Sequence, residues 1–253
     1  SEMCIRDRSK ITQYGDLKQF QPEGYDPSSG IYCSSQIFTG NWEDELEALT
    51  YLPRERPTED SNIIKFDADK GIVTNYLYNA FKSEDGGEHT TEITNFWEEE
   101  APDASSYTDS YYNSPKLRAI CDWFQCPKAR IRIFQQQPGI AMPIHTDFDN
   151  HRGTEKYGET LRIFVQLSDM PGGAWFRIKT GDSEMNINLQ KGQFLIFSPD
   201  KTGHGTENTM ECPRNTFMLV VKRNEWLENL VGAEGMEFID IDAMVEEKKT
   251  AVA

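Results

Sequence analysis

Short runs in which apolar and polar residues alternate fill the second half of the chain. Alternation with a period of two residues is typical of half-buried β-strands. Gly, Pro, Asn and Asp separate the runs, as they separate the strands of sandwiches and jelly rolls. The pattern therefore predicts a mainly β core with strands at 129–137, 160–167, 173–180, 184–189, 192–198 and 215–222.

The first half of the chain follows a different pattern. Residues 1–35 are polar and rich in Gly, Pro, Ser and Gln, so we expect an irregular arm there. The acidic run after Asn41 predicts a short helix with Asn41 as its N-cap. A second helix is predicted to begin at Ser114, with Pro115 in its first turn. Two further strand candidates lie at 34–39 and 71–81.

We find no internal repeat and no boundary between domains in this pattern. We therefore predict a single domain over residues 1–253. In this domain the helices and strands of 36–128 support a jelly-roll core at 129–224, and a helix and tail follow at 225–253. The segment 83–107 is polar and acidic, and we expect a long loop or lid there.

The chain is strongly acidic, with 42 Asp and Glu against 26 Lys and Arg and a net charge of -16. An acidic surface repels phosphate, which argues against nucleic acids and anionic membranes as partners. No apolar run reaches the roughly 18 residues of a membrane span. The five cysteines lack the spacing of a disulfide framework, so we expect reduced thiols and a cytoplasmic protein. The expected partner is a small-molecule or peptide substrate, and an oligomer is compatible with the sequence.

The segment PIHTDFDN places His145 two residues before Asp147. In a strand, residues i and i+2 project from the same side, so both side chains would face one direction. An imidazole and a carboxylate on one face suit a divalent first-row metal. One more histidine would complete the two-histidine, one-carboxylate ligand set of non-haem Fe(II) oxygenases.

His204 is the strongest candidate for this further ligand among the four histidines of the chain. It follows the apolar strand predicted at 192–198, and we expect it in the loop after that strand. The interval from His145 to His204 leaves room for strands that return the chain to the same place. His89 lies upstream in the acidic segment, and His151 follows the first pair too closely to come from another strand.

Arg214 lies shortly after His204, at the start of another predicted strand. From that position its side chain would point into the same cavity as the metal. A guanidinium binds a carboxylate through two parallel hydrogen bonds. We therefore predict Arg214 as the anchor of a carboxylate-bearing co-substrate, with an ordinary surface arginine as the alternative.

These four residues match the pattern H-x-D…H…R, and the chain resembles the Fe(II)/2-oxoglutarate-dependent dioxygenases over residues 129–224. The resemblance implies a double-stranded β-helix, which is a cupin-like jelly roll. It implies that His145, Asp147 and His204 are the catalytic iron ligands and that Arg214 grips the distal carboxylate of 2-oxoglutarate. The implied cofactors are Fe(II), 2-oxoglutarate and O2, and the implied products are succinate, CO2 and a hydroxylated substrate.

A closer resemblance is to the aspartyl/asparaginyl β-hydroxylase and cis-proline hydroxylase branch, through residues 158–167, 192–197 and 204–208. It implies that Arg162 contacts the other carboxylate of the co-substrate and that the substrate is a free or peptide-bound amino acid. The chain departs from the branch in having Phe164 where a histidine is usual. A cross-strand salt bridge is the alternative role of Arg162.

Four further side chains are candidates for binding. Gln135 precedes the predicted metal strand and is a candidate to hold the co-substrate or a water, and Gln137 is a candidate for the substrate. Phe164 shares the face of Arg162 by alternation, and Trp175 is a candidate to line the mouth of the substrate site. The alternatives are solvent exposure for the glutamines and packing for the aromatic residues.

Two other functions are compatible with the same residues. One is a non-catalytic, cupin-like protein that binds a metal or a small molecule, and the other is a different metal-dependent enzyme on a cupin frame. Arg214 and Arg162 favour the oxygenase, because a non-catalytic site does not require clamps for carboxylates. A different enzyme would usually need a third histidine near the first, and His151 is poorly placed for that role.

Overall fold

The computed structural model describes residues 31–49, 52–53, 72–78, 107–146, 160–170, 172–180, 183–199, 202–232 and 236–252. The predicted lid at 83–107 and Asp147 lie outside these residues, apart from Tyr107. The strands are β1 (Ile31–Thr39), β2 (Leu52–Pro53), β3 (Ile72–Tyr78), β4 (Lys128–Gln136), β5 (Ala141–His145), β6 (Thr160–Gln166), β7 (Ala174–Thr180), β8 (Ser183–Ile187), β9 (Gln193–Phe197), β10 (Gly203–Asn208), β11 (Arg214–Lys222) and β12 (Glu237–Asp240). The helices are α2 (Glu43–Ala48), α3 (Asp109–Asn113), α4 (Pro115–Trp123), α6 (Glu225–Gly232) and α7 (Ile241–Val252).

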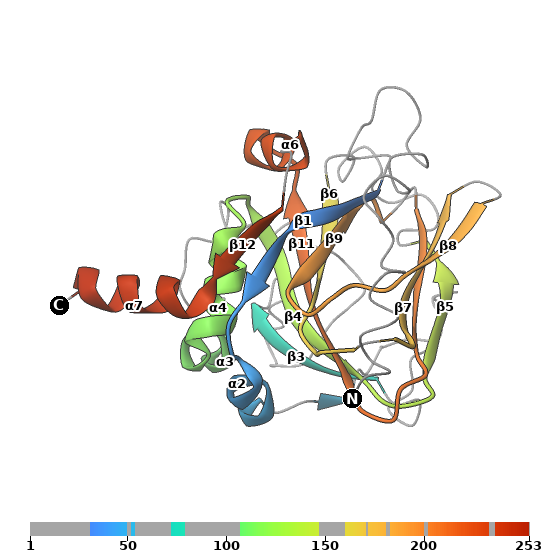
Figure 1. Cartoon of the computed structure of the whole chain (residues 1–253), viewed down its shortest axis with the longest axis horizontal. Helices are drawn as coiled ribbons and strands as arrows, with labels where there is room; N and C mark the ends of the chain where they lie inside the picture. Colours follow the sequence, from blue (N-terminus) through green and yellow to red (C-terminus); the bar gives the residue numbers. More distant parts are fainter. Residues whose placement is uncertain are drawn as a thin grey trace, which may run out of the picture.

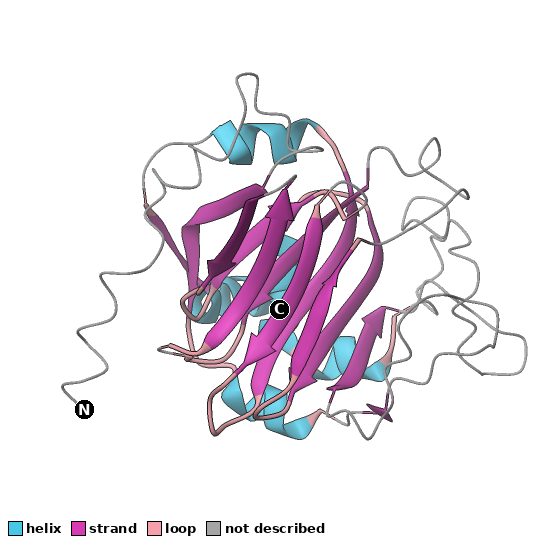
Figure 2. Cartoon of the chain, turned by 90° about the vertical axis from the view of Figure 1, so that its right-hand side faces the viewer, coloured by secondary structure: helices cyan, strands magenta, loops and turns pink. Residues whose placement is uncertain are grey.

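The described strands form two sheets that face each other (Figures 1 and 2). The large sheet has eight strands in the order β12-β1-β9-β6-β11-β4-β3-β2, and the small sheet has four in the order β5-β10-β7-β8. From β4 to β11 the chain crosses repeatedly between the sheets, and all the pairs that these strands form are antiparallel. This winding is a double-stranded β-helix with flanking helices, so the predicted fold class is confirmed.

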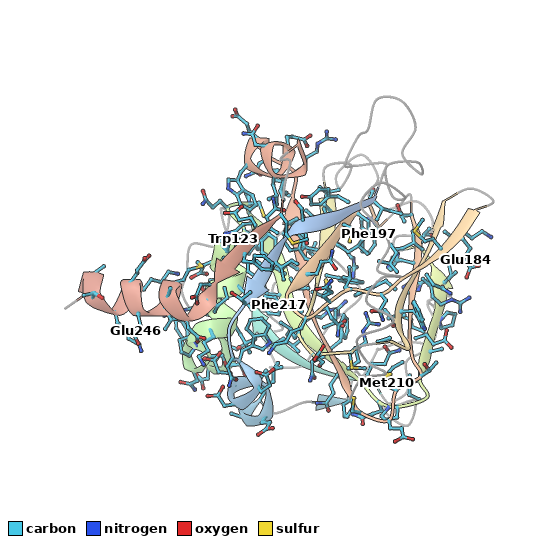
Figure 3. All side chains as sticks on the ribbon, viewed as in Figure 1. Trp123, Glu184, Phe197, Met210, Phe217 and Glu246 are labelled. Atoms are coloured by element: carbon cyan, nitrogen blue, oxygen red, sulfur yellow. The ribbon has the colours of Figure 1, made fainter. Side chains whose placement is uncertain are left out.

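Alternation along the strands of the large sheet sends side chains to two separate cores. On β11, Phe217 and Leu219 pack in a core that includes α4 and α6, whereas Met218 packs between the two sheets. Figure 3 labels Phe217 and Trp123 on the helix side of the large sheet and Phe197 on the side of the small sheet. The inner face of the large sheet is therefore available to a site inside the barrel.

Two boundaries in the first half differ from the prediction. Strand β1 begins at Ile31, inside the segment predicted to be irregular, because Ile31 pairs with Phe197 of β9 and both are buried. Tertiary pairing here outweighs the polar composition of the segment. Helix α2 begins at Glu43 with Trp42 at the N-cap, and the Asn41 side chain accepts a hydrogen bond from the Glu43 N–H at 3.3 Å.

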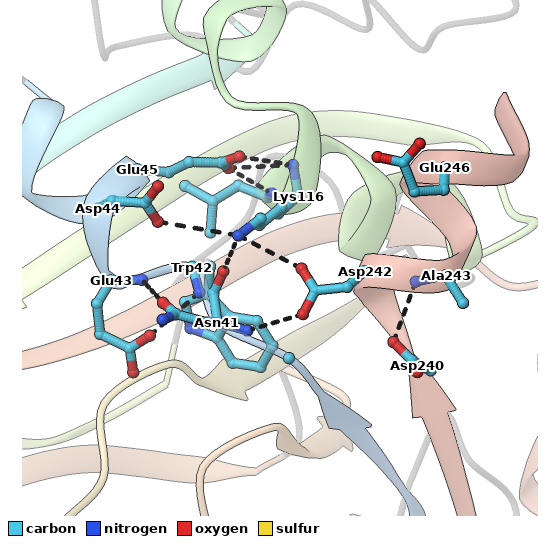
Figure 4. Close-up of polar contacts among 12 residues, drawn as sticks. Asn41, Trp42, Glu43, Asp44, Glu45, Lys116, Asp240, Asp242, Ala243 and Glu246 are labelled. Atoms are coloured by element: carbon cyan, nitrogen blue, oxygen red, sulfur yellow. Dashed lines mark hydrogen bonds and ion pairs between the residues drawn. The ribbon is translucent and has the colours of Figure 1, made fainter. Parts of the chain in front are cut away.

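The helical side is held together by polar contacts at the start of α4, which begins at Pro115 as predicted (Figure 4). The carboxylate of Glu45 is buried and accepts hydrogen bonds from the backbone N–H groups of Lys116 and Leu117, at 2.9 Å and 3.0 Å. The Lys116 ammonium lies 3.3 Å from the Asp242 carboxylate of α7. Glu45 thus caps the first turn of α4 from another helix and supplies acceptors for donors that would otherwise lack them.

No helix among the described residues is long and apolar enough to cross a membrane.

Candidate functional site

The structure brings the two predicted metal-binding histidines together. His145 ends β5, and its Cα pairs in register with that of His204 on the antiparallel strand β10. The ring centroids are 4.5 Å apart and the ring planes meet at 46°. His204 is 3% exposed, whereas His145 is partly exposed at the end of its strand. One of the two histidines is therefore deep in the barrel and the other lies nearer to solvent.

A hydrogen bond to the backbone orients each imidazole. The Nδ1 of His145 lies 2.9 Å from the Pro143 carbonyl oxygen, and the Nδ1 of His204 lies 3.0 Å from that of Thr202. A carbonyl oxygen only accepts, so these contacts place the proton of the neutral ring on Nδ1 and the lone pair on Nε2. Metal-binding histidines are usually oriented in this way, because the second hydrogen bond fixes both the tautomer and the direction of the ligand nitrogen.

Close approach of β5 to β10 depends on the glycine after His204. A Cβ atom on Gly205 would lie 2.5 Å from the carbonyl oxygen of Met142 on β5, so a side chain cannot be accommodated. The register between the two strands shifts at this point. The sequence prediction placed His204 in a loop, but it lies within β10. The glycines on either side of His204 suggested a turn, whereas here they allow close contact between neighbouring strand backbones.

The third predicted ligand, Asp147, lies outside the described residues. Within the described part of the chain, no group of three His, Cys, Asp or Glu side chains could hold a metal ion. The described geometry therefore brings two candidate ligand nitrogens together, and all three metal ligands remain predictions from the sequence. In the sequence, Asp147 follows His145 by two residues.

Arg214 is buried between the sheets at the beginning of β11. Its side chain is 1% exposed, and the Cζ atom lies 4.1 Å from the ring centroid of Phe176. Nε donates to the Gln166 side-chain oxygen at 3.0 Å, and Nη1 donates to the Trp175 carbonyl oxygen at 3.1 Å. Nη2 has no hydrogen-bond partner among the described residues. The guanidinium is thus held from one side and offers a donor on another.

Burial without a described carboxylate partner is costly for a cation. This desolvation lowers the pKa of Arg214 to about 9. An anionic ligand would remove the cost by supplying both the missing charge and the missing acceptor for Nη2. The site therefore passes a physical test for binding a carboxylate, which is the group that 2-oxoglutarate would present.

Arg162 and Phe164 lie on the same inner face, on β6. Their Cα partners on β11 are Val220 and Met218, and the Nη1 of Arg162 lies 3.7 Å from the Met218 sulfur. The Phe164 ring centroid is 6.5 Å from that of His204. Phe164 is therefore brought towards the histidine pair, and Arg162 shares its inner face, as the alternation in the sequence predicts.

Three other predicted site residues point away from this face. Gln135 pairs with Asn215 and hydrogen bonds to its side chain, while Gln137 donates to Gln135. Trp175 precedes Phe176 on β7, and Phe176 is the residue that packs inside the barrel. The structure does not bring the side chains of Gln135, Gln137 and Trp175 to the histidines, because the inner positions of β4 and β7 have the opposite parity. Only the carbonyl of Trp175 reaches the site, through Arg214.

The parity of β4 brings a residue that the sequence reasoning missed to the inner face. Arg132 pairs with Met218, and its guanidinium lies over the Phe134 ring with Cζ 4.5 Å from the centroid. The run ARIRIF contained the signal, since Arg132 alternates with the apolar residues Ile131 and Ile133. Those isoleucines pack on the helix side, which sends Arg132 into the barrel.

No protein-family model and no curated protein matches the chain. Among solved structures, an oxidoreductase of the 2OG-Fe(II) oxygenase family from Burkholderia pseudomallei aligns over 72% of this chain and 76% of its own, at 11% identity and TM-score 0.40. A Pseudomonas putida prolyl-4-hydroxylase aligns over 38% and 50%, at 16% identity and TM-score 0.31. A cupin domain from Bordetella pertussis aligns over 37% and 80%, at 12% identity and TM-score 0.27. These values are low, and the function proposed below depends on the chain's own residues.

Proposed function

We propose that this chain is an Fe(II)- and 2-oxoglutarate-dependent oxygenase that hydroxylates a C–H bond of a free or peptide-bound amino acid. One oxygen atom of O2 enters the substrate as hydroxyl and the other enters succinate, while the carboxyl group next to the oxo carbon leaves as CO2. The observation that carries the proposal is the buried guanidinium of Arg214, which has a donor without a partner among the described residues. It lies between the large sheet, which carries it, and the small sheet, which carries His145 and His204.

In this proposal, one set of residues binds the metal and another set binds the dicarboxylate co-substrate, 2-oxoglutarate. His145, His204 and Asp147 would bind Fe(II), with Nε2 as the ligand atom of each histidine. Iron, when bound, supplies the activation of O2 that no protein side chain can perform. The Nη atoms of Arg214 donate to the distal carboxylate of the co-substrate, and Gln166 fixes the guanidinium through Nε.

Apolar side chains around the pair of histidines give the site a second role, which is the exclusion of water. The Phe197 ring centroid lies 4.8 Å from that of His204, and Phe164 packs against Phe197 at 5.2 Å. A dry surrounding strengthens every hydrogen bond to the co-substrate, since the effective dielectric constant is low. It also protects the reactive centre from side reactions with solvent.

The test is the release of succinate from 2-oxoglutarate by anaerobically purified protein supplied with Fe(II) and then O2, with a panel of amino acids and peptides. We expect turnover with at least one substrate, and loss of more than about 90% of it in the Arg214→Met and His204→Ala variants, as for removal of a group that binds the reactants. The matched control is Arg177→Met, since Arg177 lies on the outer face of β7 and pairs with Glu184 at 2.7 Å. A wild-type protein that binds metal but releases no succinate with any substrate would favour the cupin-like binding protein instead.

A further inference from the structure

Arg132 is a second buried guanidinium with no carboxylate partner among the described residues. Its side chain is 2% exposed. Nε and Nη1 are both buried and have no hydrogen-bond partner among the described residues. Stacking on Phe134 at 4.5 Å gives the guanidinium a firm position but does not satisfy these donors. A natural protein keeps such a group at a cost in stability, which points to a ligand that completes it.

The register of the large sheet places Arg132 beside the candidate metal centre. Arg132, Met218 and Phe164 are cross-strand neighbours in one row over β4, β11 and β6. Phe164 in turn faces His204, with ring centroids 6.5 Å apart. A ligand that contacts Arg132 from inside the barrel would therefore lie between the two sheets, in the interior that His204 also faces.

Arg132 and Arg214 occupy different places along that face. Arg214 pairs with Gln136, which is four residues from Arg132 along β4. At about 3.4 Å per residue the two positions are about 14 Å apart along the strand. Each guanidinium also has its own aromatic partner, Phe134 for Arg132 and Phe176 for Arg214. This separation favours two carboxylates held at two places over one carboxylate shared by both arginines.

The charge of the interior favours the same conclusion. Arg132 and Arg214 are both buried, whereas Glu45 is the only acidic side chain that is buried among the described residues. Glu45 caps α4 on the helical side and cannot balance them. Together with Fe(II), these two guanidiniums carry more positive charge than Asp147 and a bound 2-oxoglutarate would neutralise. The remaining positive charge suits an anionic substrate.

We propose that Arg132 binds a carboxylate of the substrate, and hence that the substrate is a free α-amino acid or a similar small carboxylic acid and not a residue within a peptide. This inference rests on the proposed function and narrows its substrate class. A residue inside a peptide has no charged α-carboxylate to offer, so it would leave Arg132 buried and unneutralised. Phe134, Phe164 and Met218 surround the position with apolar groups, which favours an apolar remainder of the substrate.

The experiment measures binding on the full chain loaded with Mn(II) under anaerobic conditions, so that no turnover is required. The probes are 2-oxoglutarate, the free L-amino acids and their carboxamides, each followed by the thermal midpoint and by titration calorimetry at constant ionic strength. We expect at least one free acid to bind and its amide to bind at least about tenfold more weakly, as expected for loss of a charge-assisted hydrogen bond. Arg132→Met should abolish that preference, leave 2-oxoglutarate binding intact, and raise the thermal midpoint of the unliganded protein.

Two variants make the outcomes distinguishable. Arg214→Met should lose 2-oxoglutarate binding. Lys128→Met is the control, because it removes another buried cation of β4, whose ammonium donates to the Cys126 carbonyl. It should change neither 2-oxoglutarate binding nor the preference for the free acid. Should Arg132→Met not fold, Arg132→Gln replaces it. Failure of wild-type protein to bind 2-oxoglutarate overturns the proposed function. Intact 2-oxoglutarate binding with no free acid preferred over its amide, or equal loss of 2-oxoglutarate binding in Arg132→Met, overturns the role of Arg132 alone.

Discussion

His145 and His204 are direct cross-strand partners, and each turns its Nδ1 towards the carbonyl oxygen of the residue two positions earlier. The same local device thus orients both rings, although they come from different strands. With Nδ1 committed to a backbone carbonyl, Nε2 is the nitrogen that each neutral ring can offer to a metal. The ring centroids, 4.5 Å apart, are close enough for one ion to reach both nitrogens.

Replacing either histidine should abolish tight metal binding, because one strand pair supplies both nitrogens. We expect His204→Ala and His145→Ala to weaken Co(II) binding at least about a hundredfold, as loss of a ligand exceeds the 10–100-fold effect of losing an outer-shell partner. The d–d absorption of Co(II) gives the measurement, and His89→Ala is the control. Unchanged Co(II) spectra in both variants would contradict the site.

The binding of 2-oxoglutarate should weaken at alkaline pH. Burial lowers the pKa of Arg214 to about 9, so the guanidinium is charged below that pH and loses its proton above it. The loss of affinity should begin near pH 9, where the unliganded protein loses the proton, and continue until the higher pKa of the carboxylate complex is reached. Calorimetric titration of the Mn(II)-loaded protein between pH 7 and 10.5 checks this, with metal occupancy followed in parallel. A dissociation constant that stays level across the range would show that Arg214 remains charged or does not bind the co-substrate.

Gln166 should act by positioning Arg214. Gln166→Leu removes the acceptor of the Arg214 Nε hydrogen bond and leaves that donor buried, which costs about 1–3 kcal/mol. We expect weaker 2-oxoglutarate binding together with reduced stability. Gln193→Leu is the matched control, since Gln193 is also buried but its amide donates to the Ser34 carbonyl on β1. Equal 2-oxoglutarate affinity in the two variants would exclude the positioning role.

The strands could be predicted from the sequence because alternation is a local signal, and the pairing of His145 with His204 could be predicted from their residue type and from their places relative to the predicted strands. Strand β4 was predicted at 129–137 and observed at Lys128–Gln136, and β6 at 160–167 and observed at Thr160–Gln166. Periodicity gives two faces for each strand but does not say which face is inside. The structure accordingly turns Arg132, and not Gln135, to the inner face of β4.

Pairing with distant strands decided the remaining features. Ile31 joins the sheet because it pairs with Phe197 of β9. The composition of residues 1–35 gives no sign of pairing with a strand so far along the chain. His204 lies in a strand since β5 and β7 flank its glycine-rich segment on both sides. Register of this kind depends on three-dimensional contact, so local composition cannot predict it.

Gly192 should tolerate no side chain. Its φ is +82°, and a Cβ atom would lie 1.9 Å from the Phe38 carbonyl oxygen, in the backbone of β1. Gly139 has a similar φ of +74° but nothing within 4 Å of the added atom. Gly139→Ala should therefore cost about 1–2 kcal/mol from backbone strain alone, and Gly192→Ala should cost more than about 4 kcal/mol or prevent folding. Chemical unfolding measures both, and equal costs would show that β1 and the turn before β9 do not approach as described.

The cap that Glu45 provides for α4 should contribute to the stability of the fold by holding α2 against α4 on the helical side of the large sheet. Its carboxylate accepts two backbone N–H bonds at the first turn of α4, and its removal leaves those donors buried or exposes them to water. Loss of a cap costs about 0.5–2 kcal/mol, and burial places Glu45→Ala at the upper end. Glu47→Ala on the exposed side of α2 is the control and should change stability by less than about 0.5 kcal/mol.

Burial raises the pKa of Glu45, so the folded protein binds a proton at this carboxyl more tightly than the unfolded chain does. This contribution to stability is present at low pH and is lost as pH rises through the folded pKa. The pH dependence of unfolding between pH 4 and 7 should accordingly differ between wild type and Glu45→Gln, and identical profiles would contradict a buried, ionisable cap.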